Sequence, residues 1–127
     1  MRGVRVEPIQ VFSDPRGSLH KLLPGPVSGE VYLVRAEPGA RRGDHRHERM
    51  GEWFTALSGS GVLAIVDPAT GERAEYDLRG ARVYVPAGLV HTVIAGPDEP
   101  FEVLAFADRL HDPGDVFPAA VSPGGEP

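Results

Sequence analysis

Apolar and polar residues alternate in short runs along most of the chain. The run EVYLVRA at residues 30–36 is the clearest, with β-branched and aromatic residues at alternate positions, and FEVLAFA at 101–107 is another. A period of two is typical of β-strands that bury one face. The same pattern predicts further strands at 4–12, 18–23, 52–57, 62–66, 73–78, 82–85 and 89–95. No segment has the spacing of a helix of useful length.

Glycine and proline separate these runs and mark the turns. The chain has 16 glycines and 13 prolines among 127 residues, spread along its length. Pro8 lies inside the first run and cannot donate a ladder hydrogen bond, so this strand is predicted at an edge or a bulge. Residues 37–44 are predicted to form a loop. Many short strands at regular turn spacing predict an all-β sandwich or barrel.

Composition limits the class of protein. Apolar residues make up 41% of the chain and charged residues 24%, as in ordinary globular proteins, and 127 residues suffice for one domain. We expect a domain at residues 1–117 and a flexible tail at 118–127. The chain has no cysteine, so disulfides and thiolate metal sites are excluded. The net charge of −5 argues against nucleic-acid binding. No apolar run has the length of a membrane span or a signal peptide, so a cytoplasmic location is expected.

Three of the five histidines fall in two short stretches. His45 and His47 are two residues apart, which places both on one face of a strand. Glu52 follows closely, and His91 lies on a later predicted strand. Three imidazoles and a carboxylate suit one divalent Zn, Fe, Mn, Ni or Cu ion. A His-x-His pair alone is often polar surface, so this interpretation depends on the fold bringing Glu52 and His91 to the pair. Occupancy should then fall as the pH drops through roughly 6, near the reference histidine pKa.

The other histidines and aromatic residues are interpreted as structural. His20 and His111 match no motif and are expected not to be ligands. Tyr32 is predicted to pack in a sheet with its hydroxyl at the edge, and Trp53 to serve packing rather than substrate binding.

These residues resemble the two sequence motifs of the cupin superfamily. The first is matched by Gly39-x5-His45-x-His47-x4-Glu52-x6-Gly59, and the second by Gly80-x5-Pro86-x-Gly88-x2-His91. An asparagine usually closes the second motif, and this chain has Ala95 there. The resemblance implies a cupin-type jelly-roll β-barrel, or double-stranded β-helix, with His45, His47, Glu52 and His91 as ligands in its lumen.

A second likeness covers about a third of the chain. Asp14, Arg16 and Gly17, followed by the Arg42-Gly43-x-His45 stretch, resemble cupins that epimerise or isomerise nucleotide-linked sugars. The resemblance implies that Arg42 helps to hold the diphosphate and that His45 acts as a base. His45 and His47 are therefore the catalytic candidates as well as ligand candidates.

Four arginines surround the paired histidines. They are Arg41, Arg42, Arg46 and Arg49. A solvated, salt-bridged loop is one interpretation, since acidic residues are interspersed. The other is an anion site, because the guanidinium group is a fork of donors that suits carboxylates and phosphates.

Three functions remain open from the sequence. One is metal-binding isomerase or epimerase chemistry on a small anionic or nucleotide-linked sugar, by proton transfer next to a carbonyl. The others are non-catalytic binding of a small ligand and a metal-dependent dioxygenase, which fits less well than an isomerase. The second catalytic group and the identity of the metal are not specified. A homodimer is expected, because an edge strand tends to be covered.

Overall fold

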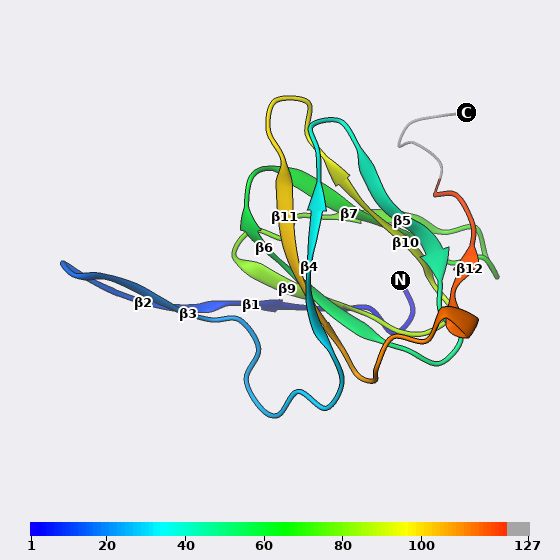
Figure 1. Cartoon of the computed structure of the whole chain (residues 1–127), viewed down its shortest axis with the longest axis horizontal. Coiled ribbons are helices and arrows are strands. Elements are labelled where there is room, and N and C mark those ends of the chain that lie inside the picture. Colours follow the sequence, from blue (N-terminus) through cyan, green and yellow to red (C-terminus); the bar gives the residue numbers. More distant parts are fainter. Residues whose placement is uncertain (122–127) are drawn as a thin grey trace.

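A computed structural model describes residues 1–121 and shows a barrel made of two five-stranded antiparallel sheets (Figure 1). We name the sheets after their central strands. The β6 sheet has the order β1 (Arg5–Pro8), β9 (Ala81–Val85), β6 (Glu52–Ser58), β11 (Phe101–Ala107), β4 (Val31–Ala36). The β10 sheet has the order β12 (Phe117–Pro118), β5 (Arg41–Arg46), β10 (Val90–Ala95), β7 (Gly61–Val66), β8 (Arg73–Tyr76). The all-β jelly-roll prediction is confirmed.

Alternation along the strands builds the core between the sheets. In β11, Phe101, Val103 and Ala105 are fully buried, whereas Leu104 and Phe106 face outward and are half-buried. Burying a side chain such as Phe101 stabilises the fold by about 1.5–3 kcal/mol. The same alternation of inward and outward positions decides which polar side chains of the other strands point into the barrel.

A two-stranded hairpin leaves the barrel at the end of β1. Strands β2 (Gln10–Asp14) and β3 (Gly17–Lys21) pair only with each other, and all their residues are exposed. The hairpin extends away from the barrel as the blue arm in Figure 1. It carries the exposed apolar residues Val11, Phe12 and Leu19. Strand β1, which ends at Pro8, lies at an edge of the β6 sheet, as its proline predicts.

The predicted loop at 37–44 is wrong in its second half, because β5 begins at Arg41. The strand pairs with β10, and the register shifts between His91 and Thr92. Gly43 at this irregularity has φ +130°. The prediction failed because this strand is charged, contains glycine and has a bulge, so it lacks the apolar alternation by which strands are recognised in a sequence.

The packed domain extends beyond the expected boundary at residue 117. A single 3-10 turn, η1 (Pro113–Asp115), precedes β12, which pairs with β5. Val121 is buried, and its N–H donates to Asp44 Oδ1 at 3.0 Å. The rest of the predicted tail, 122–127, lies outside the described residues.

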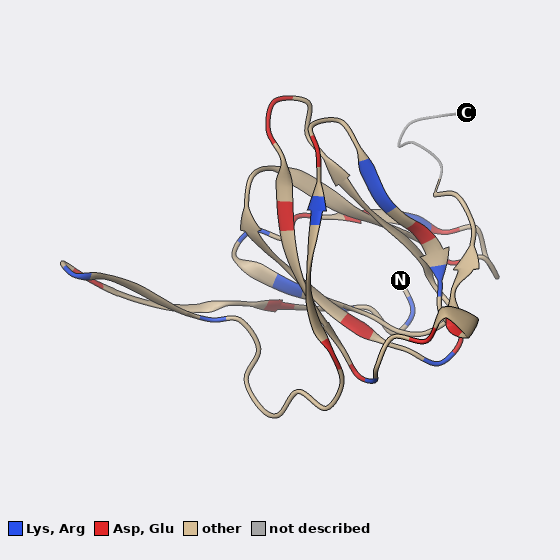
Figure 2. Cartoon of the chain, in the orientation of Figure 1, with Lys and Arg blue, Asp and Glu red and all other residues tan. Residues whose placement is uncertain are grey.

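Charges of both signs are distributed over both sheets and the hairpin (Figure 2). Within residues 1–121, no helix is long and apolar enough to cross a membrane.

Candidate metal centre

The fold brings the four predicted ligand residues together inside the barrel. Register pairs His91 on β10 with His45 on β5, and His47 follows directly after β5. One ring nitrogen from each of these three histidines lies within 4.8 Å of the others. Glu52, the first residue of β6, reaches the cluster from the facing sheet.

Glu52 approaches two of the three histidines closely. Its Oε1 lies 3.2 Å from His47 Nε2 and 3.3 Å from His91 Nε2. Glu52 is 3% exposed and both histidines are 4% exposed, whereas His45 is half-buried. A carboxylate this deeply buried is costly unless positive charge or donors compensate it.

Backbone carbonyls determine which nitrogen of each buried imidazole carries the proton. His47 Nδ1 lies 2.8 Å from the carbonyl oxygen of Asp115, and His91 Nδ1 lies 3.4 Å from that of Leu89. A carbonyl oxygen can only accept, so each Nδ1 donates, and in a neutral ring Nε2 keeps a lone pair. Three acceptors then face one another: the two Nε2 atoms and Glu52 Oε1. Neither His47 Nε2 nor Glu52 Oε1 has a hydrogen-bond partner within residues 1–121.

The electrostatics favour the neutral form of His45 and His47. Burial, followed by the neighbouring His91 and His47 rings, lowers the pKa of His45 to about 4. Burial also lowers the pKa of His47, although the carbonyl of Asp115 partly opposes it. A His47 imidazolium paired with Glu52 is therefore disfavoured at pH 7. Three imidazole nitrogens and one carboxylate oxygen fit a divalent Zn, Fe, Mn or Ni ion.

Tyr32 belongs to the cluster, and sequence reasoning missed it. Its hydroxyl donates a hydrogen bond to Glu52 Oε2, which leaves Oε1 directed at the histidines. Tyr32 is on β4, on the same face of the strand as Val34 and Ala36, which pack in or against the core. Its position on this inward face could have identified it from the sequence.

A cavity of about 540 Å³ opens onto the cluster. Its volume is within the range typical of small-molecule pockets. Apolar residues such as Phe54 and Val93 line it, and Arg42 and His111 also contribute. His111 thus lines the cavity without joining the cluster, and His20 lies on the hairpin, where its Nε2 is 2.7 Å from Ser18 Oγ.

Three of the four arginines around the histidines are engaged in ion pairs, as the salt-bridged interpretation predicts. The pairs are Arg41–Asp44 at 2.6 Å, Arg46–Glu48 at 3.2 Å and Arg49–Asp112 at 2.6 Å. Arg42 differs: it is exposed, lines the cavity and forms no ion pair within residues 1–121. Of the four arginines, Arg42 therefore remains the candidate for an anion site.

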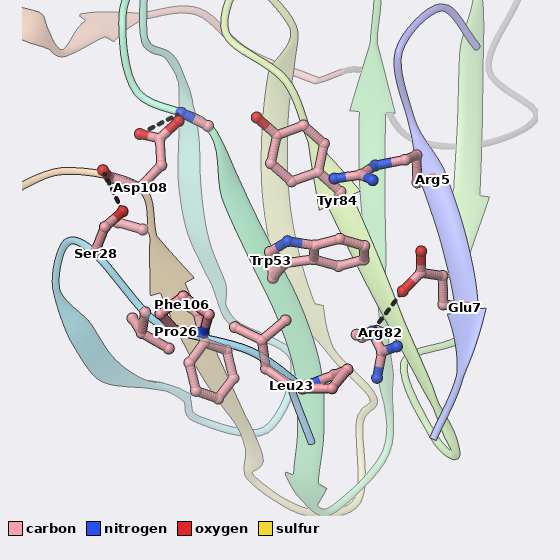
Figure 3. Close-up of a pocket in the computed structure, with 14 residues that line it drawn as sticks. Arg5, Glu7, Leu23, Pro26, Ser28, Trp53, Arg82, Tyr84, Phe106 and Asp108 are labelled. Atoms are coloured by element: carbon pink, nitrogen blue, oxygen red, sulfur yellow. Dashed lines mark hydrogen bonds and ion pairs between the residues drawn. The ribbon is translucent and has the colours of Figure 1, made fainter. Parts of the chain in front are cut away.

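A second cavity, of about 330 Å³, lies on the outer face of the β6 sheet (Figure 3). Trp53 and Tyr84 lie side by side with ring centroids 5.3 Å apart, and the guanidinium of Arg5 covers both rings. Trp53 follows Glu52 on β6 and therefore points away from the barrel interior. This outer cavity and the histidine–Glu52 cluster are on opposite faces of the sheet.

Comparisons with known proteins agree with the fold. A reductase of Pseudomonas aeruginosa that is described as UDP-2-acetamido-2,6-beta-L-arabino-hexul-4-ose reductase is 26% identical over 107 residues, and the match spans 82% of this chain but only 29% of that protein. The capsular polysaccharide assembling protein CapF of Staphylococcus aureus has a TM-score of 0.68 at 27% identity, covering 90% of this chain and 35% of CapF.

Another solved structure is similar over nearly the whole chain, although its sequence is less similar. A dTDP sugar isomerase of Desulfovibrio desulfuricans has a TM-score of 0.82 at 18% identity and covers 98% of this chain and 87% of that one. The model of the polysaccharide biosynthesis C-terminal domain family matches residues 12–116. This chain is therefore a cupin that belongs to the polysaccharide biosynthesis C-terminal domain family.

Proposed function

We propose that this cupin holds one divalent transition metal at His45, His47, Glu52 and His91 and acts on a nucleotide-linked keto sugar. The reaction would be an isomerisation or epimerisation by proton transfer next to the carbonyl. The proposal rests above all on one observation: two imidazole lone pairs and a buried carboxylate oxygen converge at 3.2 and 3.3 Å without hydrogen bonds between them.

The chemistry of this cluster supports a cation. Buried acceptors that face one another repel, and a cation between them removes the repulsion. A bound divalent metal would supply Lewis acidity toward a carbonyl or hydroxyl oxygen of the substrate. Four protein ligands would leave one or two positions for water or substrate.

The substrate class is supported from two directions. Arg42 lies at the cavity that holds the cluster and has no ion-pair partner within residues 1–121, and guanidinium groups bind phosphates through paired hydrogen bonds. The relatives carry the names of UDP- and dTDP-sugar enzymes. A nucleotide-linked sugar would place its diphosphate at Arg42 and its sugar ring in the cavity.

Among the histidines, His45 is best placed to move a proton. A keto group acidifies the neighbouring C–H bonds, and a neutral imidazole can remove such a proton. His45 is half-buried, so a substrate in the cavity reaches it more readily than the enclosed His47. Its low pKa keeps it unprotonated at neutral pH. A neutral imidazole has a single lone pair, so His45 can accept a proton only when it is not bound to the metal. We therefore assign proton transfer to His45 in that state, and assign His47, the other catalytic candidate, to the cation.

Solvent isotope exchange tests the activity directly. Purified protein, after its metal content has been measured, is incubated in D2O with UDP- and dTDP-linked 4-keto sugars, and NMR follows the carbons adjacent to the carbonyl. We expect deuterium at one or both of these carbons, with His45→Ala reducing the exchange rate by at least 100-fold.

Matched arginine variants test the anion site. Arg42→Ala should raise KM at least tenfold, because it removes an unpaired guanidinium at the cavity, whereas Arg46→Ala, which breaks an exposed ion pair, should leave KM within twofold. Binding of the sugar nucleotide without any exchange would refute the catalytic proposal and support a ligand-binding cupin instead. Oxygen consumption with the metal-loaded protein would favour a dioxygenase.

A further inference from the structure

Asp115 is a buried acid outside the ligand set. It is the last residue of η1 and is 3% exposed. The turn itself is capped by Asp112, whose side chain accepts the N–H of Gly114 at 2.9 Å. Neither aspartate belongs to a cupin motif in this sequence, and both lie in a segment without strand alternation.

The carboxylate of Asp115 binds the chain that links two candidate ligands. Its Oδ1 accepts the N–H of Glu48 at 2.8 Å, and its Oδ2 accepts the N–H groups of Arg49 and Met50, each at 3.2 Å. These three residues lie between His47 and Glu52. Backbone N–H groups at a turn need acceptors, and one carboxylate supplies all three here.

The main chain of Asp115 acts on His47 directly. Its carbonyl oxygen accepts the Nδ1–H of His47 at 2.8 Å. This bond fixes both the rotation of the ring and the tautomer, so that the lone pair of Nε2 is directed at Glu52 Oε1. A residue 68 positions later in the chain thus determines how His47 is presented.

We propose that Asp115 is a positioning residue that holds the His47–Glu52 link with its carboxylate and the His47 imidazole with its carbonyl, so that His47 Nε2 and Glu52 Oε1 face one cation. The inference rests on the proposed metal centre for its effect on affinity. The hydrogen-bonding partners of metal-bound histidines generally orient the ring and contribute 10–100-fold to metal affinity.

The first test compares two aspartates of the same turn. Asp115→Asn places an amide N–H₂ or a weaker acceptor against three N–H donors, and we expect Zn²⁺ affinity, measured by chelator competition, to fall 10–100-fold. Asp112→Asn makes the same chemical change at an exposed position and keeps the capping oxygen, so Zn²⁺ affinity should stay within twofold. A purely structural role would lower the melting temperature of metal-free Asp115→Asn and leave its Zn²⁺ affinity unchanged, which would overturn the proposal.

The second test needs neither metal nor a variant. Long-range ¹H–¹⁵N NMR of metal-free wild-type protein at pH 7.5 reports which nitrogen of His47 carries the proton. We expect a protonated Nδ1 and an unprotonated Nε2, and the opposite tautomer would refute the positioning role. If wild-type protein bound no metal, the proposed function would fail, while this tautomer measurement would still decide the role of Asp115.

Discussion

At the scale of single residues, the carboxylate of Glu52 determines the chemistry of the cluster. It is buried, accepts the hydroxyl of Tyr32 with one oxygen and directs the other at two imidazole lone pairs. Its environment is complete only when a positive charge lies among these atoms. The residue-scale predictions therefore concern the occupancy of this position by a metal.

Removing His47 should weaken metal binding far more than removing a histidine elsewhere. His47→Ala deletes one of four ligands, so we expect the Zn²⁺ affinity to fall by at least 100-fold, or about 2.7 kcal/mol. His20→Ala is the control, because His20 lies on the hairpin and contacts Ser18. Titration of metal-stripped protein, followed by thermal melting, measures the difference, since a metal that binds only the folded state raises the melting temperature. Equal effects of the two variants would exclude the four-ligand site.

The pH dependence should differ from that of an ordinary histidine site. The pKa of His45 falls from 6.5 to about 4 in the folded protein, so the unfolded chain takes up the proton first as the pH falls. The stability of the metal-free protein should therefore be highest above pH 6.5 and decline as the pH falls toward 4.

The same shift delays proton competition for the metal. With Zn²⁺ held near its dissociation constant at pH 7.5, we expect the site to lose half its metal below pH 6, lower than the reference histidine pKa implies. Inductively coupled plasma analysis after rapid gel filtration measures occupancy at each pH. Half-loss at pH 6.5 would contradict the lowered pKa of His45.

Sequence spacing predicted the site residues that belong to a motif or to one face of a strand. It could not predict residues that act through contacts with distant parts of the chain. His45, His47, Glu52 and His91 were predicted because their separations match the two cupin motifs, and the pairing of β5 with β10 opposite β6 brings them together. Asp115 was not found, because its effect on His47 depends on how an irregular segment packs after the barrel has formed. Sequence alternation carries no information about such a contact.

At the scale of elements, strand β5 shows why a binding strand can be hard to recognise. Its sequence, RRGDHR, is polar throughout, yet it pairs with β10 and holds His45 opposite His91. Apolar alternation predicted the core strands correctly because their parity is set by burial, as in β11. Strand β5 faces the cavity with histidine rather than with an apolar side chain, so the same criterion placed most of it in a loop.

Gly43 should be essential to this pairing. A Cβ at Gly43 would lie 2.8 Å from the His91 carbonyl oxygen and 2.9 Å from Thr92 Cα, and its φ of +130° disfavours any other residue. We expect Gly43→Ala to lower the free energy of unfolding by roughly 2–4 kcal/mol, the sum of backbone strain and displacement of β5 from β10. Metal affinity should fall with it, because the displaced strand carries His45.

Gly39→Ala separates steric contact from backbone strain. Gly39 has φ +74°, but among residues 1–121 no heavy atom beyond its chain neighbours lies within 4 Å of an added Cβ. Its loss should therefore be about 1–2 kcal/mol, with metal affinity unchanged. Chemical denaturation and metal titration of both variants provide the comparison, and equal losses of stability would show that the contact with β10 has no separate effect.

At the scale of the whole molecule, the exposed hairpin is the feature that the single chain leaves unsupported. Two-stranded hairpins are marginally stable in water, and the strands of this one pair only with each other within residues 1–121. It exposes Phe12 and Leu19, while Val31 and Leu33 are exposed on the outer face of the β6 sheet. We propose that a second copy of the chain covers these apolar surfaces in a homodimer.

The dimer should depend on the apolar residues of the hairpin. We expect light scattering at micromolar concentration to show a dimer for the wild type and a monomer for the Phe12→Asp/Leu19→Asp double variant, because buried charge at an interface is costly. Leu110→Asp is the control, since Leu110 is 72% exposed on the C-terminal loop and away from the hairpin. A monomeric wild type would refute the proposal.

The late position of Asp115 in the chain has a consequence for the order of assembly during translation. The ribosome makes all four candidate ligands before it makes η1 and β12, which fix His47 and pair with β5. A nascent chain that ends before Asp115 has the histidines but lacks the carbonyl oxygen that orients His47. Metal insertion is thus expected after synthesis has passed this turn, which protects the unfinished chain from trapping a cation in a misaligned site.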